Sequence, residues 1–201
     1  PKSKTDSQES SIVKKENDAP LLFSRREGES YAGRIVVVKV GQEDLISEAR
    51  FKFMKRVVKK AKRENPSALI LEIDTPGGIV YYTLEAILET FQGVDFPTYS
   101  FVNTRALSAG SLIALSTDHI YMYPTSSIGA SLAIQGTGAD IEGDAAKKTN
   151  SVLQASVEAV ALAKGHNPDV ANAFITKDGL VVDGVTPVSY THLRAHETPI
   201  N

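Results

Sequence analysis

LILEIDTPGG, residues Leu69–Gly78, joins an apolar run of strand length to a turn rich in Pro and Gly. The first five residues have the length and composition of a β-strand, and TPGG ends it. Apolar residues then recur at helical spacing and predict one apolar helix face; they are Val80, Leu84, Ile87, Leu88 and Phe91. This stretch therefore predicts a strand, a tight turn and a helix in direct succession.

The same order of elements recurs on both sides of this stretch. Upstream, IVVVKV (Ile35–Val40) is a near-continuous β-branched run, as expected for a strand buried on both faces. Residues 48–64 follow with apolar positions at helical spacing amid eight Lys and Arg, which we interpret as a solvated face. Downstream, TYSFVN is a strand, RALSAGS a turn and SLIALS a short helix, and HIYMY and SIGASLAI predict two more strands. Strands that alternate with helices predict an α/β fold with a mostly parallel sheet.

Composition narrows the class of protein. The chain has 201 residues, 42% hydrophobic and 23% charged, with a formal net charge of −2 and no Cys. These values are typical of one soluble globular domain. The absence of Cys excludes a thiolate nucleophile and any Cys-based metal site, and the near-neutral charge argues against nucleic-acid binding. No stretch approaches the ~18–20 apolar residues of a membrane helix, and no signal peptide is visible.

The two ends differ in texture from the middle. Residues 1–30 are rich in Lys, Ser, Glu and Asp and predict a flexible polar tail. Residues 188–201 contain VSYTHLRAHET, which resembles a translated adapter from DNA library preparation, so we expect a non-native tail there. His192 and His196 would present two imidazoles to one metal on a helix, but this resemblance argues against a metal site. Residues 31–187 then form the folded domain.

Two turns carry candidate chemistry, because α/β folds place their sites at the carboxyl ends of parallel strands. Gly77 and Gly78 offer backbone N–H groups at a helix start, as in an oxyanion hole, although a plain tight turn is the alternative. Ser108, in LSAG, lies between a strand and a helix. It is either a helix N-cap or a nucleophile, with the Ala109 N–H and a TPGG glycine N–H stabilising the oxyanion.

These motifs together resemble a known family. DTPGG after an aliphatic strand, SAG opening a helix, IYMYPTSSIGA, and a lysine-bearing helix ending in KGHNPDV resemble the NfeD-type, ClpP-class serine peptidases related to signal peptide peptidase A, over residues 35–178. The resemblance implies a ClpP/crotonase-like fold of repeated strand-strand-helix units. It also implies that Ser108 is the nucleophile, that a lysine near position 148 is the general base, and that Gly77 or Gly78 acts with Ala109. The family continues with another helix and strand, so we expect the domain to be C-terminally truncated.

Two adjacent lysines are candidates for the base. If Asp144 is the N-cap of a helix that runs to Lys164, Lys148 shares an apolar stripe with Val152, Ala155, Ala159 and Leu162. Lys147 instead aligns with Ser151, Gln154 and Glu158, a polar stripe. Burial and the helix dipole would both lower the pKa of Lys148, as a neutral amine base requires, so we favour Lys148. The alternative is that both lysines are solvated in a loop.

A Ser-His-Asp triad is the competing mechanism. His119 starts a strand that carries no catalytic group in the family, and His166 stands at a helix end, where a capping role is usual. We therefore expect a Ser–Lys dyad, with no metal and no organic cofactor.

The predicted function is that of a serine endopeptidase which cleaves peptide or membrane-protein segments through an acyl-enzyme. The resemblance implies an extracytoplasmic or membrane-associated homo-oligomer, with a stomatin-like protein as a possible partner. Two alternatives remain open. One is a crotonase-type acyl-CoA enzyme, and the other is a catalytically silent scaffold that binds a stomatin-like partner.

Overall fold

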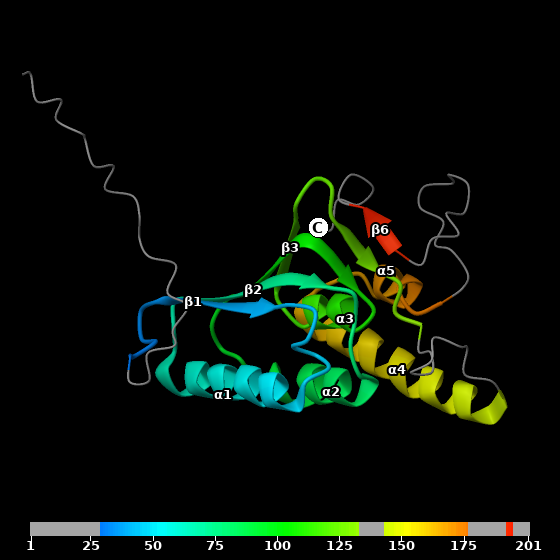
Figure 1. Ribbon diagram of the computed structural model, residues 1–201, viewed down its shortest axis with the longest axis horizontal. Coiled ribbons are helices and arrows are strands. Elements are labelled where there is room, and N and C mark those ends of the chain that lie inside the picture. The colour runs from blue at the N-terminus through cyan, green and yellow to red at the C-terminus, as the bar shows by residue number, and fades with distance from the viewer. Residues whose placement is uncertain (1–28, 133–142, 177–191, 195–201) are drawn as a thin grey trace, which may run out of the picture.

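A single mixed sheet organises the chain. The computed structural model describes residues 29–132, 143–176 and 192–194, and within these ranges the strand order is β1-β2-β3-β5-β6, with β4 also paired to β3 (Figure 1). All pairs are parallel except β5 with β6. The strands are β1 (Ile35–Val40), β2 (Ala68–Thr75), β3 (Thr98–Leu107), β4 (His119–Met122), β5 (Ser127–Gly129) and β6 (His192–Arg194). The predicted α/β fold with a mostly parallel sheet is confirmed.

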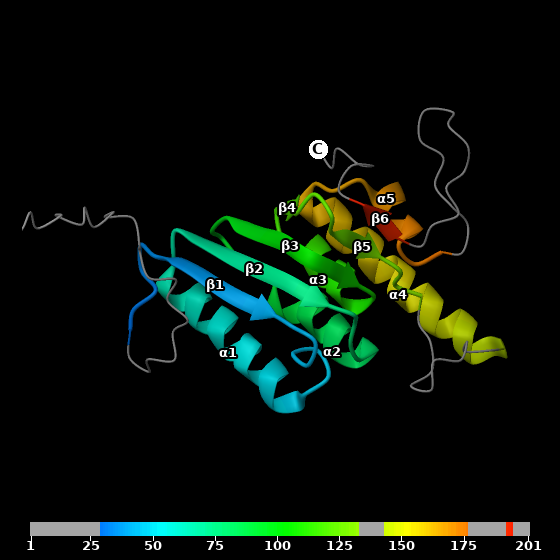
Figure 2. The ribbon, with the colours of Figure 1, turned by 45° about the horizontal axis from the view of Figure 1, so that its top comes forward.

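The helices α1, α2 and α3 lie on one side of the sheet (Figures 1 and 2). Their bounds are α1 Glu48–Glu64, α2 Val80–Glu85, a π-helical turn η1 Ala86–Thr90, α3 Ala109–Leu115, α4 Gly143–Lys164 and α5 Pro168–Ala173. Helix α4 ends at Lys164 as predicted, but it begins at Gly143, so Asp144 lies in its first turn and is not the N-cap. Among the described residues, none of the helices combines the length and the hydropathy that a membrane span requires.

The prediction that β1 is buried on both faces is wrong. Its residues alternate, with Val36, Val38 and Val40 buried while Ile35 is 61% exposed. The reason is that β1 packs against helix α1 on one face and lies at the edge of the sheet, paired only to β2 in the described structure. A β-branched run therefore does not distinguish a one-sided edge strand from a central one.

The predicted helix after TPGG changes type midway. Residues 80–85 are α-helical and residues 86–90 are π-helical. Side chains hydrogen-bond to backbone carbonyls in this segment. The Thr90 hydroxyl donates to the Glu85 carbonyl, and the Gln92 side-chain amide donates to the Ile87 carbonyl. Because the turn is wider than 3.6 residues, Leu88 leaves the predicted apolar face and is 44% exposed.

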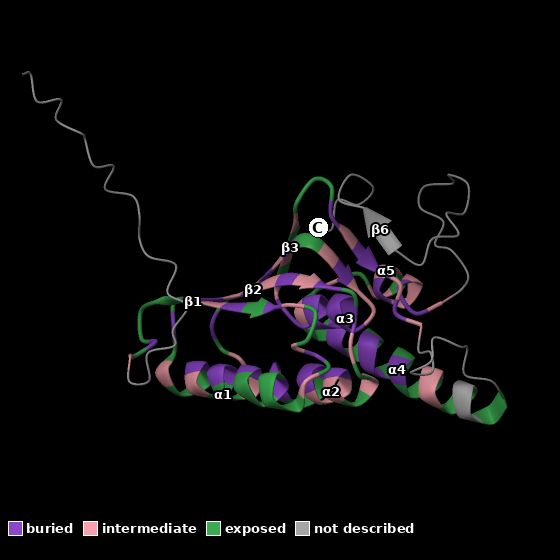
Figure 3. Cartoon of the chain, in the orientation of Figure 1, coloured by how far each residue is buried: buried purple, intermediate pink, exposed green. Residues whose placement is uncertain are grey.

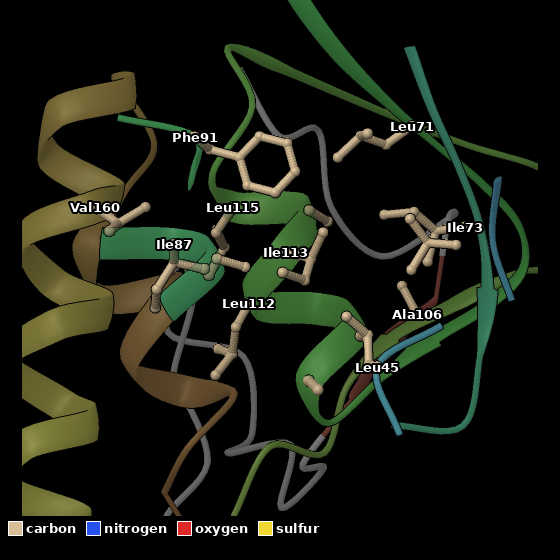
Figure 4. Packing of buried hydrophobic residues seen from close by; sticks show 14 of the residues in the cluster. Leu45, Leu71, Ile73, Ile87, Phe91, Ala106, Leu112, Ile113, Leu115 and Val160 are labelled. Atoms are coloured by element: carbon tan, nitrogen blue, oxygen red, sulfur yellow. The ribbon is translucent and has the colours of Figure 1, made fainter. Parts of the chain in front are cut away.

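Helix α3 lies at the centre of the core. All seven of its residues are buried (Figure 3). Its side chains Leu112, Ile113 and Leu115 lie between those of the sheet, such as Ile73, and those of η1 and α4, such as Ile87 and Val160 (Figure 4). A helix held on all sides gives its N-terminus a fixed place relative to the sheet.

A register shift brings the two candidate turns together. Strands β2 and β3 pair regularly up to Ile73 opposite Val102, after which Thr75 lies opposite Ala106. Both strands run in the same direction, so TPGG and LSAG leave the sheet at the same edge. A side chain on Gly110 would come within 2.4 Å of the Thr75 Cγ2, so the missing side chain allows this close approach.

Candidate active site

Ser108 occupies a strained junction between β3 and α3. Its φ of 51° and ψ of −122° belong to a region that favours glycine. Its N–H donates to the Gly129 carbonyl at 2.8 Å, and its own carbonyl accepts the Ser111 N–H at 3.0 Å. The backbone is therefore held in this conformation by hydrogen bonds on both sides. Strained residues of this kind cluster at functional sites.

The hydroxyl of Ser108 does not cap the helix that follows it. Ser108 is the N-cap residue of α3, but its side chain makes no capping hydrogen bond. The sequence left open that Ser108 is a helix N-cap. The residue does occupy the N-cap position, but its Oγ makes no capping hydrogen bond. An Oγ that is not engaged in capping is available for chemistry.

Thr75 shapes the TPGG turn. Its side chain is fully buried, and its Oγ1 donates to the Gly77 carbonyl at 3.1 Å and accepts the Gly77 N–H at 3.3 Å. The next amide, Gly78, has no such side-chain acceptor among the described contacts and lines a pocket with Ser108. A side chain on Gly78 would come within 2.3 Å of the Leu45 Cβ, so this glycine is required by packing.

A small pocket of about 50 Å³ opens at Ser108. The polar residues that line it are Thr83, Ser108 and Ser131, and the small residues Gly78 and Ala109 line it as well. Its apolar lining comes from Val80, Leu112, Leu132 and Leu153. The Ala109 amide is the first of α3, and the first amides of a helix have no intrahelical acceptor. Ser108, Gly78 and Ala109 are thus brought together at one pocket.

The structure does not place Lys148 on a buried stripe, and that prediction is wrong. Lys147 and Lys148 are both exposed, and Lys147 lies 3.6 Å from Asp144. Helix α4 buries a different set of side chains, namely Leu153, Val157, Val160 and Ala161. The stripe that contains Lys148 faces away from the described domain, with Val152 48% and Leu162 61% exposed. The first turns of α4 project beyond the other elements (Figures 1 and 2).

Neither His119 nor His166 lies beside Ser108. His166 makes a 2.7 Å hydrogen bond with the Thr117 carbonyl, and burial lowers its pKa below the ordinary value. Thr117 follows the last turn of α3, whereas Ser108 precedes the first, so the two residues lie at opposite ends of this helix. His119 is exposed and stacks on Tyr99. Both occupy structural positions.

Of the two histidines in the C-terminal tail, only one lies among the described residues. His192 lies in β6, opposite Gly129 of β5, and His196 lies outside the described residues. Within the described ranges, no group of three or more His, Asp or Glu side chains could hold a metal.

Two buried serines near the site were not anticipated from sequence. The hydroxyls of Ser111 and Ser131 contact each other and approach the Ser108 carbonyl oxygen at 2.8 and 3.1 Å. Ser131 is held in turn by its N–H, which donates to the Phe174 carbonyl at 2.6 Å. The only sequence signal was the polar residue after GA in SIGAS, which is equally typical of a surface loop.

Comparison with known proteins identifies the family to which this chain belongs. Residues 35–189 match the family model described as NfeD1b, N-terminal domain. The membrane protein NfeD1b of Bacillus subtilis is 32% identical over 147 residues, which are 73% of this chain and 32% of that protein. The membrane-bound protease PH1510 of Pyrococcus horikoshii is 36% identical over 129 residues, 61% of this chain and 29% of that protein. The chain therefore spans about a third of the length of these relatives.

A solved relative has the same fold. The 1510-N membrane-bound stomatin-specific protease, in a serine-to-alanine mutant, superimposes with a TM-score of 0.64 at 28% identity, over 83% of this chain and 75% of that one. A lysine-to-alanine mutant of the same protease, in complex with a substrate peptide, gives a TM-score of 0.60 at 30% identity, over 73% and 67%. The ClpP-like fold expected from the motifs is confirmed.

Proposed function

The chain belongs to the NfeD1b N-terminal domain family, and from that premise we propose that it is a serine endopeptidase acting on peptide or membrane-protein segments through an acyl-enzyme. One observation carries the proposal. Ser108, whose hydroxyl caps no helix amide, lines a pocket together with Gly78 and Ala109. Homology to a membrane-bound stomatin-specific protease supports the same class of activity.

The proposed first step is attack by the Ser108 Oγ on a peptide carbonyl carbon. The hydroxyl proton passes to the neutral amine of Lys148, and the carbonyl oxygen becomes an oxyanion. Collapse of this intermediate breaks the C–N bond, and the lysine ammonium protonates the leaving amine. A water molecule, deprotonated by Lys148, then hydrolyses the ester and restores Ser108. No metal or organic cofactor takes part.

We assign the oxyanion contacts to the N–H groups of Gly78 and Ala109. Gly77 was an equal candidate from sequence, but its N–H already donates to the Thr75 hydroxyl. Gly78 lines the pocket, and its N–H has no acceptor among the described contacts. Preorganised backbone donors of this kind contribute about 2.7–4 kcal/mol each to transition-state stabilisation. Gly77 then serves by leaving room for Ser108.

Lys148 is the proposed general base, and its exposed side chain would have to be brought to Ser108 from the first turns of α4. Leu153 of α4 lines the Ser108 pocket, and Lys148 stands five residues earlier, a rise of about 7.5 Å and a turn of about 140° around the helix. A lysine was also one of the residues replaced in the mutants of 1510-N.

A homo-oligomer is part of the proposal. The exposed stripe of Val152, Ala155, Ala159 and Leu162 along α4 would be covered by a second copy. Size-exclusion chromatography with light scattering should give a mass above 21.6 kDa per particle. Val152→Asp with Leu162→Asp should return the protein to the monomer.

The substrate would present a small or apolar side chain, because the described pocket walls are Val80, Leu112, Leu132 and Leu153. A stomatin-like protein is the partner that the 1510-N relative suggests. The setting we propose is membrane-associated, since the matched relatives are membrane proteins, and the extracytoplasmic side is proposed from the resemblance of the motifs alone.

A catalytically silent scaffold is the second candidate function. The observation that favours it is the exposure of both Lys147 and Lys148, which leaves no described base buried beside Ser108. Such a protein would bind a stomatin-like partner without turnover. Binding that survives Ser108→Ala, in a protein that cleaves no peptide, would support this candidate.

The deciding experiment is labelling with a fluorophosphonate probe from about pH 5 to about pH 10, because the reactivity of a serine that depends on a general base varies with pH. The endopeptidase proposal requires labelling of the wild type that disappears in Ser108→Ala and Lys148→Ala. Lys147→Ala is the matched control, because it removes a neighbouring exposed lysine, and it should label normally. A folded wild-type protein that does not label would contradict the proposal.

A further inference from the structure

Helix α1 concentrates positive charge. It carries eight Lys and Arg against two Glu, whereas the whole chain carries 22 against 24. The rest of the chain therefore has 14 basic and 22 acidic residues. This segregation of charge is local, and the near-neutral net charge conceals it. A surface of this kind attracts an anionic partner to one side of the molecule.

The cations form one continuous face. Lys52, Lys55, Arg56, Lys59 and Lys62, which we call the basic face, recur at helical spacing along α1 and line a groove of about 430 Å³. The opposite wall of the groove is Glu89 and Thr90 of η1. The exposed side of α1 in Figure 3 points away from the sheet.

Only part of this charge is neutralised within the protein. Lys52 pairs with Glu48 at 2.6 Å and Lys55 pairs with Glu85, whereas Lys62 donates only to the uncharged Gln92 carbonyl. Neither Arg56 nor Lys59 forms a salt bridge within the described ranges, and both are exposed. Two unneutralised cations thus stand one helical turn apart on the basic face.

Apolar side chains flank the basic face. Phe53 is 48% exposed on α1, and the Arg56 guanidinium lies 5.9 Å from the centre of its ring. Leu88 of η1, next to the groove residue Glu89, is 44% exposed. Exposed cations beside exposed apolar side chains are typical of helices that lie at a membrane interface. A purely electrostatic partner such as nucleic acid would not need the apolar side chains.

We propose that the basic face of α1, with Phe53 and Leu88, docks on an anionic phospholipid surface. Lipid phosphates would pair with Arg56 and Lys59, which form no salt bridge within the described ranges. The two apolar side chains would enter the interfacial region of the bilayer. The matched relatives are membrane proteins, so a phospholipid surface would lie near this domain. The proposal does not depend on the catalytic activity of Ser108.

Docking at this face would bring the Ser108 pocket near the membrane. Helix α1 is joined to α2 by the Lys55–Glu85 ion pair and by the stacked rings of Phe51 and Tyr82, 4.7 Å apart. Helix α2 supplies Val80 and Thr83 to the pocket. A substrate segment that emerges from the bilayer would then meet the pocket within a short distance.

The test is flotation of the full chain with vesicles of phosphatidylcholine alone or with roughly one third phosphatidylglycerol. We expect binding only to the anionic vesicles, weakened by added salt. Arg56→Gln with Lys59→Gln should lower the affinity about thirtyfold, and each single variant about fivefold, since each cation near the surface contributes on the order of 1 kcal/mol. Phe53→Ser should weaken the binding that persists at high salt.

Arg34→Gln with Lys39→Gln is the matched control, because it removes the same net charge from side chains that pair with Glu29 and Glu72. It should change the affinity less than threefold. Circular dichroism should show that every variant is folded. Equal losses in the two double variants, equal binding to neutral vesicles, absence of binding, or a preference for RNA over vesicles would each overturn the proposal.

Discussion

Gly77 and Ser108 lie so close across the two turns that a side chain on Gly77 would collide with the serine. A Cβ built on Gly77 would lie 2.9 Å from the Ser108 Cβ, closer than such atoms approach in proteins, and 3.3 Å from its Oγ, tighter than most such contacts. Gly77 also has a φ of 140°, which L side chains rarely adopt. The glycine in the first turn therefore sets where the serine in the second can lie. This contact is the most direct physical link between the two motifs.

Gly77→Ala should abolish fluorophosphonate labelling, because the new methyl group must displace the Ser108 side chain. It should also lower the free energy of unfolding by about 1–3 kcal/mol, as measured by urea denaturation, since the backbone conformation disfavours alanine. Gly93→Ala is the control, because Gly93 also has a positive φ, 61°, but nothing lies within 4 Å of the added Cβ. That variant should lose stability and keep its labelling. If Gly77→Ala labels normally, the contact does not position the nucleophile.

Gly110→Ala should destabilise the fold through overpacking. The added Cβ would lie 2.4 Å from the Thr75 Cγ2 in a region without free space, and insertions of this kind cost about 1–3 kcal/mol. Thr75→Ser removes that methyl group and keeps the hydroxyl that holds the Gly77 turn. The double variant should therefore recover part of the stability lost in Gly110→Ala, as a double-mutant cycle would measure. Strict additivity of the two losses would show that the clash is relieved elsewhere.

The sequence predicted the elements well because their signals are local. The strands at Ile35–Val40 and Thr98–Asn103 and the long helix over 48–64 follow from residue type and spacing, and the structure has them at β1, β3 and α1. The TPGG turn was identified correctly, whereas the predicted turn RALSAGS is mostly strand and helix, because β3 runs to Leu107 and α3 begins at Ala109. Both junctions nevertheless lie at one edge of the sheet, as expected for the strand ends of a parallel sheet.

The errors arose where a pattern allows two arrangements. Helix α4 has apolar residues on two stripes, one through Leu153 and Val157 and one through Val152 and Leu162, and only tertiary packing selects the first for the core. Spacing alone therefore cannot show which way Lys148 points. The roles of Ser111 and Ser131 depend on contacts between segments 20 residues apart, which no local pattern encodes.

Asp118 should make stability depend on pH at the acidic end. Burial raises the pKa of this carboxyl, but hydrogen bonds from Lys164 and from the Thr98 hydroxyl and N–H outweigh that effect and lower the pKa below its ordinary 3.8. A depressed carboxyl pKa stabilises the folded state fully above the unfolded value, and the contribution is lost as the pH falls through the folded value. Urea denaturation of the wild type should therefore show declining stability below about pH 4.

Asp118→Asn is the variant that isolates this effect. It should be less stable than the wild type at neutral pH, and its stability should fall less steeply in acid. Asp169→Asn is the control variant, because it removes another acidic side chain, at the start of α5. Parallel acid profiles for the wild type and Asp118→Asn would show that other carboxyls govern the transition.

Ser108→Gly should be more stable than Ser108→Ala, because glycine relieves the strain of φ 51° and ψ −122° while alanine keeps it. The relief of about 1–3 kcal/mol is offset in part by the greater freedom of glycine in the unfolded chain, so we expect a net difference of about 0.5–2 kcal/mol. Ser47 provides the control, since it is also an N-cap without a side-chain capping bond but has an ordinary φ of −82°. The difference between glycine and alanine at position 47 measures the plain N-cap preference. A difference at position 108 no larger than at position 47 would mean that the site stores no strain at its serine, whereas a larger one would show stability given up to hold the Ser108 hydroxyl at the pocket.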